Sequence, residues 1–320
     1  MDTQELHVVF GTGPLGLATA RELLAKGKAV RMVNRSGRGE APKGATLVRG
    51  DAYDAKVVAE LCAGASVVYQ CAQPAYTEWV TKFPPLQASI IEGVARSGAK
   101  LVVVENLYMY GPHEGPLRED LPYAATTRKG RVRAQIAESL MAAHRSGTVR
   151  ATAGRGSNFY GPHVLGSTVG ERTFGPMLQG KAAQAIGNID MPHTYTYIED
   201  FGRALVTLGE HDEALGQAWH VPNPPALTTR QFLNIAFEQL GRKAAVQAMG
   251  RLMLTIGGIF VPEARESIEM LYEFDEPLLV DHSKFESAFG ASVTPHNEGI
   301  RRTLAWYRAH LGEKAVVQPA

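Results

Sequence analysis

The chain of 320 residues is 45% apolar, which is enough to bury a substantial core, so disorder is not expected. Lysine and arginine together number 33 against 32 aspartates and glutamates, so no overall field favours nucleic acid or an anionic membrane, and we predict neither as a partner. The two cysteines, Cys62 and Cys71, form no Cys-x-x-Cys pair, so neither a disulfide framework nor a metal site is indicated, and a cytoplasmic location is expected.

Short apolar runs alternate with helix-like segments through the first half of the chain. The runs are LHVVF (6–10), AVRMV (29–33), TLVRG (46–50), SVVYQCA (66–72) and KLVVVEN (100–106). Continuous apolar strands need helices on both faces, so this rhythm predicts an α/β fold with a Rossmann-type doubly wound parallel sheet.

The pattern loosens after residue 150 into segments rich in glycine and proline. We predict an NAD(P)-binding Rossmann domain over residues 1–160. A smaller C-terminal substrate lobe is expected over 161–320, with late strands and helices that return to the sheet. The apolar stretch LMLTIGGIFV (252–261) is too short to cross a bilayer, and we expect it to pack in a core.

A glycine-rich loop, FGTGPLG (10–16), directly follows the first predicted strand and opens a predicted helix. Its G-x-G-x-x-G spacing in this context favours a dinucleotide site over a purely structural turn. The first glycine would permit the tight turn, the second a close approach to a pyrophosphate, and the third the contact between helix and strand. The loop residues predicted to bind the cofactor are Gly11, Thr12, Gly13, Pro14, Leu15 and Gly16.

The second strand ends in Asn34, Arg35 and Ser36, where an enzyme selecting NAD would usually carry an acid. A guanidinium at this position suits a 2′-phosphate through a forked, charge-assisted contact. We therefore predict NADP as the cofactor, with NAD less favoured. The alternative is that Arg35 is a solvated surface arginine.

Further segments accompany the glycine loop in a characteristic order. They are GDAYD (50–54), VVYQCAQP (67–74), ENLYMYGP (105–112), RGSNFYGP (155–162) and YTYIEDFGRAL (195–205). Together they resemble the extended short-chain dehydrogenase/reductases, the NAD-dependent epimerase/dehydratase group, over nearly the whole chain. The resemblance implies a possible homodimer through the helices at about 86–98 and 130–145.

The same resemblance implies cofactor contacts at the ends of later strands. Asp51 resembles the residue that bonds the adenine amino group, although a carboxylate at a strand end can equally cap the next helix. The crevice beyond the carboxyl ends of the strands is where such a sheet binds ligands. The further residues expected to line the cofactor are Ala52, Cys71, Ala72, Gln73, Asn158 and Tyr160.

The resemblance does not extend to the catalytic residues. The family uses a serine or threonine after the fifth strand and a Tyr-x-x-x-Lys motif on the next helix, in which the lysine lowers the pKa of the tyrosine. That motif is absent here. Counting back from Glu138 puts the tyrosine position on Gly130 and the lysine position on Ala134, while Asn106 stands where the serine or threonine would be.

Two cations lie beside the vacant positions. Lys129 and Arg133 are four residues apart and would share a helix face, so either can bind the nicotinamide ribose or an anionic substrate. The alternative for both is a solvated helix face. We expect the stem of Lys129 to extend into the space beside Gly130. Catalytic roles are predicted for Tyr108 as proton donor, for Lys129 and for Asn106, with Lys129 also on the cofactor.

The substrate is less well indicated than the cofactor. Residues predicted to contact it are Tyr76, Tyr108, Arg133, Tyr160 and His193. The leading hypothesis is an NADP-dependent oxidoreductase that reduces a small carbonyl or an activated C=C compound. A nucleotide-sugar epimerase or dehydratase is the second hypothesis, and its late lobe should offer a diphosphate site. The third is a non-catalytic NADP-binding sensor.

Overall fold

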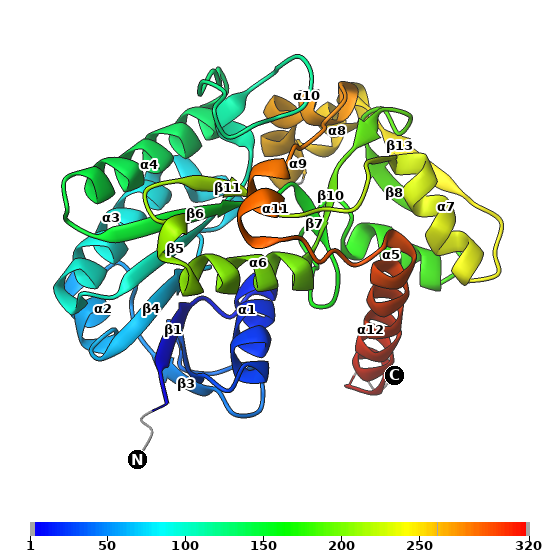
Figure 1. Cartoon of the computed structure of the whole chain (residues 1–320). Coiled ribbons are helices and arrows are strands. Elements are labelled where there is room, and N and C mark those ends of the chain that lie inside the picture. Colours follow the sequence, from blue (N-terminus) through cyan, green and yellow to red (C-terminus); the bar gives the residue numbers. More distant parts are fainter. Residues whose placement is uncertain (1–3, 261, 318–320) are drawn as a thin grey trace.

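A parallel sheet forms the centre of the molecule in the computed structural model, which describes residues 4–260 and 262–317 (Figure 1). Within these residues the sheet has seven strands, and every neighbouring pair is parallel. In spatial order the strands are β11 (Ala218–His220), β6 (Arg150–Arg155), β5 (Lys100–Glu105), β4 (Ala65–Gln70), β1 (Leu6–Phe10), β2 (Ala29–Asn34) and β3 (Thr46–Arg49). This arrangement confirms the predicted Rossmann-type α/β fold.

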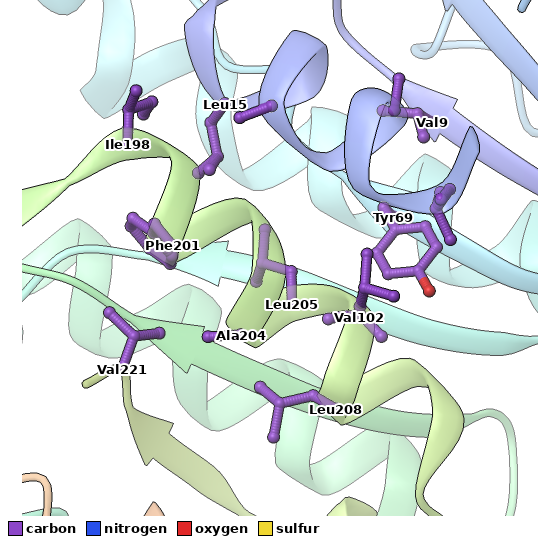
Figure 2. Close-up of a cluster of buried hydrophobic side chains, with 14 of the residues drawn as sticks. Val9, Leu15, Tyr69, Val102, Ile198, Phe201, Ala204, Leu205, Leu208 and Val221 are labelled. Carbon is purple, nitrogen blue, oxygen red and sulfur yellow. The ribbon is translucent and has the colours of Figure 1, made fainter. Parts of the chain in front are cut away.

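Helices cover both faces of the sheet. On one face lie α1 (Pro14–Ala25) and α6 (Ile198–Glu210), and on the other lie α2 (Ala55–Leu61), α3 (Trp79–Ser97) and α4 (Arg128–Arg145). Figure 2 shows Phe201 and Leu205 of α6 in the first of these two cores, close to Leu15 of α1. The strands read as continuous apolar runs because both of their faces are buried in this way.

The ligand crevice follows from the strand order. The chain runs outward from β1 through β2 to β3 on one side, and from β4 through β5 to β6 on the other. The order therefore reverses between β1 and β4, whose carboxyl ends meet where Phe10 is in register with Gln70. Ligands of open α/β sheets bind at such a switch point. The loops that follow β1, β2, β4 and β5 all open at this edge.

A smaller group of late elements packs beside this edge around its own aromatic core. That core contains Tyr160, Phe174, Tyr195, Phe232 and Tyr307. The elements are β7 (Asn158–Tyr160), α5 (Glu171–Leu178), β8 (Ala183–Ile186), β9 (Pro192–His193), β10 (Tyr195–Tyr197), β12 (Leu227–Thr228), α7 (Thr229–Gln239), β13 (Val246–Met249) and α12 (His296–Val317). Among these strands, β10 pairs with β7, β12 with β9 and β13 with β8. Because α6 packs on the central sheet and β11 is one of its strands, the chain crosses between the two groups more than once. The division at residue 160 stays a prediction.

Short helices lie between the longer elements. Those after β13 are α8 (Arg251–Gly257), α9 (Pro262–Ser267), η4 (Ile268–Met270), α10 (Tyr272–Asp275) and α11 (Ser283–Phe289), and those earlier in the chain are η1 (Tyr76–Glu78), η2 (Tyr108–Tyr110) and η3 (Asp212–Ala214). Contacts of α8 with β13 and of α9 with η1 make the later helices a bridge across the crevice. Figure 1 shows α8, α9 and α10 gathered as one orange group.

The stretch LMLTIGGIFV (252–261) does not pack in a core, so that prediction is wrong. Leu252 is 74% exposed and Phe260 is 82% exposed, while Leu254 is buried. The reason is that α8 is a short helix with only one side against the molecule, so its remaining apolar side chains face outward. Val261 lies outside the described residues. No described helix is long and apolar enough to cross a membrane.

Candidate active site

The glycine loop has the geometry of a pyrophosphate cradle. Gly11 has φ +105°, and a Cβ there would lie 2.8 Å from the backbone nitrogen of Ala72, so only glycine fits. Gly13 has no described atom within 4 Å of its Cβ position, which leaves that side open. Helix α1 begins directly after Gly13 without a side-chain cap, so its first N–H groups are available to an anion. These residues fit a dinucleotide.

The loop after β2 is organised by Asn34. Its Oδ1 accepts hydrogen bonds from the backbone N–H groups of Ser36 and Gly37, and its Nδ2 donates to Thr12 Oγ1 at 3.1 Å. The Ser36 hydroxyl is also used within the loop. Arg35, in contrast, is exposed, lines the cavity and has no ion pair to a described residue. Asn34 and Ser36 are thus used within the loop, whereas the Arg35 guanidinium remains free to bind a ligand.

The ends of β3 and β4 form the next part of the wall. Asp51 Oδ1 accepts a hydrogen bond from the backbone N–H of Tyr53, and Asp54, not Asp51, caps α2. The sequence left two roles for Asp51, an adenine contact or a cap of the next helix. Asp51 does not cap α2 in the structure. Cys71 contributes a thiol 3.9 Å from Thr19 Oγ1, and burial raises the pKa of this thiol to about 12, so it lines the wall as a neutral group.

A cavity of about 1300 Å³ begins at this loop and extends past the ends of β4 and β5 to the late elements. Most of the predicted site residues line it. These are Gly11, Thr12, Gly13, Pro14, Leu15, Asn34, Arg35, Asp51, Ala52, Cys71, Ala72, Gln73, Tyr76, Asn106, Tyr108, Arg133 and Asn158. The predicted residues that do not line it are Gly16, Ser36, Lys129, Tyr160 and His193.

Lys129 does not line the cavity. It is only 1% exposed, and its Nζ pairs with Glu266 and, at 3.1 Å, with Glu269. The expected space beside Gly130 does not exist, because a Cβ on Gly130 would already lie 2.7 Å from the backbone oxygen of Tyr108. The solvated-face alternative also fails for this residue. Lys129 instead holds α9 and η4 against the start of α4.

Arg133 does face the cavity. Its guanidinium lies 4.7 Å from the ring centre of Phe83 and 5.6 Å from that of Trp79, and one of its nitrogens donates to Val104 O at 3.3 Å. Its Nε has no hydrogen-bond partner among the described residues. Burial lowers the pKa of Arg133 to about 10, which still leaves it charged at neutral pH. The site thus holds one buried cation with a donor to spare.

Two tyrosines lie near the ends of neighbouring strands, Tyr76 in η1 after β4 and Tyr108 in η2 after β5. The side chains of Tyr76 and Tyr108 share a hydrogen bond, and Asn106 Oδ1 accepts from the Tyr108 backbone N–H at 3.3 Å. Burial raises the pKa of Tyr108 well above its ordinary value, and Tyr76 and Glu273 raise it further. This is opposite to the family's tyrosine, whose pKa a lysine lowers. Tyr108 therefore stays neutral and can donate a hydrogen bond, but it is not available as an anionic base.

The other two predicted substrate contacts lie behind the cavity wall. Tyr160 is fully buried with its hydroxyl 3.4 Å from His296 Nδ1. His193 Nε2 lies 3.1 Å from the amide nitrogen of Asn158, which does line the cavity. Both rings are packed in the core of the late elements, because the strands that carry them turn these side chains inward. Their place is to support the wall.

Two residues that the sequence did not single out also reach the cavity. Glu273 of α10 is 4% exposed, its Oε2 has no partner among the described residues, and burial raises its pKa to about 8. Arg172 of α5 is exposed at the far end and makes no ion pair to a described residue. The sequence contains one signal that could have identified Glu273, because it is a single acid between apolar and aromatic residues in LYEF (271–274).

A buried ion pair supports the floor between β5 and β6. Arg155 Nε donates to Glu105 Oε2 at 2.8 Å, and both side chains are completely buried. The same guanidinium donates to the hydroxyls of Tyr110, at 2.6 Å, and Tyr123. Burial opposes the charge on Arg155, but Glu105 and the two tyrosines hold its pKa above the ordinary value. The ends of two central strands are thereby locked together beneath the cavity.

Solved structures with the same fold cover almost the whole chain. UDP-glucuronic acid 4-epimerase from Bacillus cereus, in complex with NAD, is 16% identical with a TM-score of 0.78, covering 95% of this chain and 99% of that one. A double mutant of dTDP-glucose 4,6-dehydratase from Streptomyces venezuelae, with NAD bound, is 19% identical with a TM-score of 0.78, covering 97% and 98%. UDP-N-acetylglucosamine 4-epimerase from Methanobrevibacter ruminantium is 16% identical with a TM-score of 0.78, covering 96% and 99%.

The comparison by sequence gives the family. A search of curated proteins found no significant match. The profile of the NAD dependent epimerase/dehydratase family matches residues 8–221, which is more than half of the chain and includes the glycine loop and all seven strands of the central sheet except the first two residues of β1. With the strand order and the cradle described above, this match confirms the predicted resemblance: the chain belongs to the NAD dependent epimerase/dehydratase family.

Proposed function

We propose that the protein is a nicotinamide dinucleotide-dependent epimerase or dehydratase that acts on a nucleotide-linked sugar. The observation that carries this proposal is the size and continuity of the cavity. At about 1300 Å³ it exceeds the roughly 300–1,000 Å³ typical of a pocket for one small ligand. The cavity and the solved relatives therefore support the second hypothesis from the sequence over a reductase of small carbonyls.

The cofactor would be held by the glycine loop, Arg35, Asp51 and the backbone after β4. A bound nicotinamide would supply reversible hydride transfer at the substrate carbon. Two of the solved structures with this fold contain bound NAD, which supports NAD as the cofactor of this chain. Arg35, free of any ion pair to a described residue, supports acceptance of a 2′-phosphate as well.

The far end of the cavity offers a place for an anionic diphosphate. Arg172 lies there with its guanidinium free of any ion pair to a described residue, and the polar side chains of Ser167, Thr168 and Gln184 also line the cavity. Guanidinium groups bind phosphate oxygens through paired, charge-assisted hydrogen bonds. This is the late-lobe feature that a nucleotide-sugar enzyme requires.

The test is turnover of a panel of UDP- and dTDP-linked hexoses with NAD⁺ or NADP⁺, with products separated by chromatography and identified by NMR. Arg172→Ala should raise KM for the nucleotide sugar by about 10- to 100-fold, as expected for a lost hydrogen bond to a charged group, without changing dinucleotide affinity. Arg131→Ala removes an arginine that is exposed on α4 and does not line the cavity, and it serves as the matched control. No new product from any sugar, with turnover of aldehydes or enones instead, would refute the proposal in favour of the reductase.

A further inference from the structure

The proposed reaction needs a group that exchanges a proton with a substrate hydroxyl, and the usual group is missing. The tyrosine position is Gly130, which has no room for a side chain. Lys129 is engaged by two carboxylates, and Tyr108 is held neutral by its surroundings. A neutral tyrosine can donate a hydrogen bond but cannot remove a proton. The base must come from elsewhere in the cavity.

Glu273 is the described carboxyl group that fits this need. It lies in α10 and lines the cavity, and its Oε2 is buried without a hydrogen-bond partner among the described residues. A buried carboxyl oxygen left unpaired costs stability, so a functional reason for it is expected. The two nearby glutamates of the same segment, Glu266 and Glu269, are both paired with Lys129.

The segment around Glu273 is held in place from both sides. The ring of Phe274 stacks on that of His193 with centroids 5.1 Å apart, and His193 also hydrogen-bonds the backbone of Glu273. On the preceding side, Met270 is buried and its sulfur accepts a hydrogen bond from Thr127 at the start of α4. The carboxyl group is thus presented by a positioned segment, as catalysis demands.

We propose that Glu273 is the acid/base residue of this site and exchanges the proton of the substrate hydroxyl beside Tyr76 and Tyr108. This inference rests on the proposed function. In the oxidising direction the substrate O–H bond breaks and a new O–H bond forms on the Glu273 carboxylate. The C–H hydrogen leaves with its electron pair as hydride to the dinucleotide oxidant, and the substrate carbon becomes a carbonyl. The reverse step returns the proton from the neutral carboxyl.

The groups around Glu273 leave it free to change charge near neutral pH. Burial raises the pKa values of Tyr76, Tyr108 and Tyr272 above the ordinary tyrosine value, so these remain neutral. Burial also lowers the pKa of His193 to about 3, so it remains neutral too. Burial raises the pKa of Glu273 to about 8, so both of its forms are present near neutral pH, which is the condition under which a general acid/base works best.

The test compares the full-length wild type with Glu273→Gln, Glu273→Asp and Glu276→Gln. Glu276 is an exposed glutamate three residues away and is the matched control. With the nucleotide sugar that the wild type converts, Glu273→Gln should lower kcat by about 10²-fold or more, while dinucleotide affinity measured by titration stays the same. Glu273→Asp keeps a carboxyl group and should retain part of the rate, and Glu276→Gln should match the wild type.

A second readout does not depend on turnover. Difference infrared spectra between about pH 6 and about pH 9 should show the carbonyl stretch of a protonated carboxyl in the wild type and in Glu276→Gln, and it should be missing in Glu273→Gln. Absence of this band in the wild type would overturn the inference. Full activity of Glu273→Gln beside an active wild type would also overturn it and leave the proposed function standing. A wild type that converts no nucleotide sugar would overturn the proposed function, and the inference with it.

Discussion

Replacement of Glu273 by glutamine should make the protein more stable at alkaline pH. In the unfolded chain this carboxyl ionises near its ordinary pKa of 4.5, whereas in the folded protein burial keeps it protonated up to about pH 8. Between these two values the folded state holds a proton that the unfolded state has released, so stability falls as pH rises. Glutamine has no proton to lose, and the variant should lack this part of the pH dependence.

The size of the effect follows from the width of that interval. From 4.5 to about 8 is roughly 3.5 pH units, and each unit corresponds to about 1.4 kcal/mol, which sets a ceiling of about 5 kcal/mol. The ionised carboxylate can draw in water or shift toward solvent, which reduces the cost below this ceiling. We expect Glu273→Gln to equal the wild type within about 1 kcal/mol at about pH 5 and to exceed it by about 2–4 kcal/mol at about pH 9.

The assay is urea unfolding of the wild type, Glu273→Gln and the control Glu276→Gln across this pH range. Contributions from all other titrating groups cancel in the difference between wild type and variant, provided that the sites do not couple. A difference that stays constant with pH would refute the reasoning. So would a variant less stable than the wild type at alkaline pH, because that result would mean that the carboxylate is charged and favourably paired in the folded state.

Three further predictions concern other parts of the site. Arg155→Met should lower the free energy of unfolding by about 3–5 kcal/mol because it leaves Glu105 buried without its partner. Lys100→Ala, which removes an ion pair with the exposed Asp212, should cost much less, and equal losses in urea unfolding would contradict the role of the buried pair. Arg35→Ala should weaken NADP binding by about 1.5–3 kcal/mol in calorimetric titrations and leave NAD binding nearly unchanged, and equal losses for both would remove the 2′-phosphate role. Tyr108→Phe should reduce turnover by about 10²-fold with little change in dinucleotide affinity, and an unchanged steady-state rate would show that its hydroxyl is not needed.

The strands, the glycine loop and the family were predictable because their signals are local. An apolar run such as LHVVF followed by glycines at 11, 13 and 16 describes a strand, a tight turn and a helix start in consecutive residues. The structure confirms the parallel sheet, and Gly11 has the positive φ and the close approach to Ala72 that such a turn needs. Residues that follow the strand ends were also placed at one edge by the sheet topology alone.

Helical spacing predicted that Lys129 and Arg133 share a face, but it did not decide what that face meets. In the structure a segment more than 130 residues further along supplies Glu266 and Glu269, and these carboxylates take up Lys129. Arg133 lies against the rings of Trp79 and Phe83, donates to one backbone carbonyl and remains toward the cavity. Two cations with the same local pattern thus have different environments because different distant elements pack on them.

The same reason explains the residues that sequence analysis did not reach. Burial depends on everything that surrounds a side chain, and burial is what raises the pKa of Glu273. The neighbours of Glu273, namely Tyr76, Tyr108 and His193, come from three separate parts of the chain. The apolar run at 252–261 was expected in a core because hydrophobicity is local, but no other described element covers most of it. The sequence by itself determined which segments form the strands of a parallel sheet and where the glycine loop lies. Only the tertiary structure decided which polar groups lose contact with water, and that loss of hydration is what converts an ordinary glutamate into a candidate acid/base group.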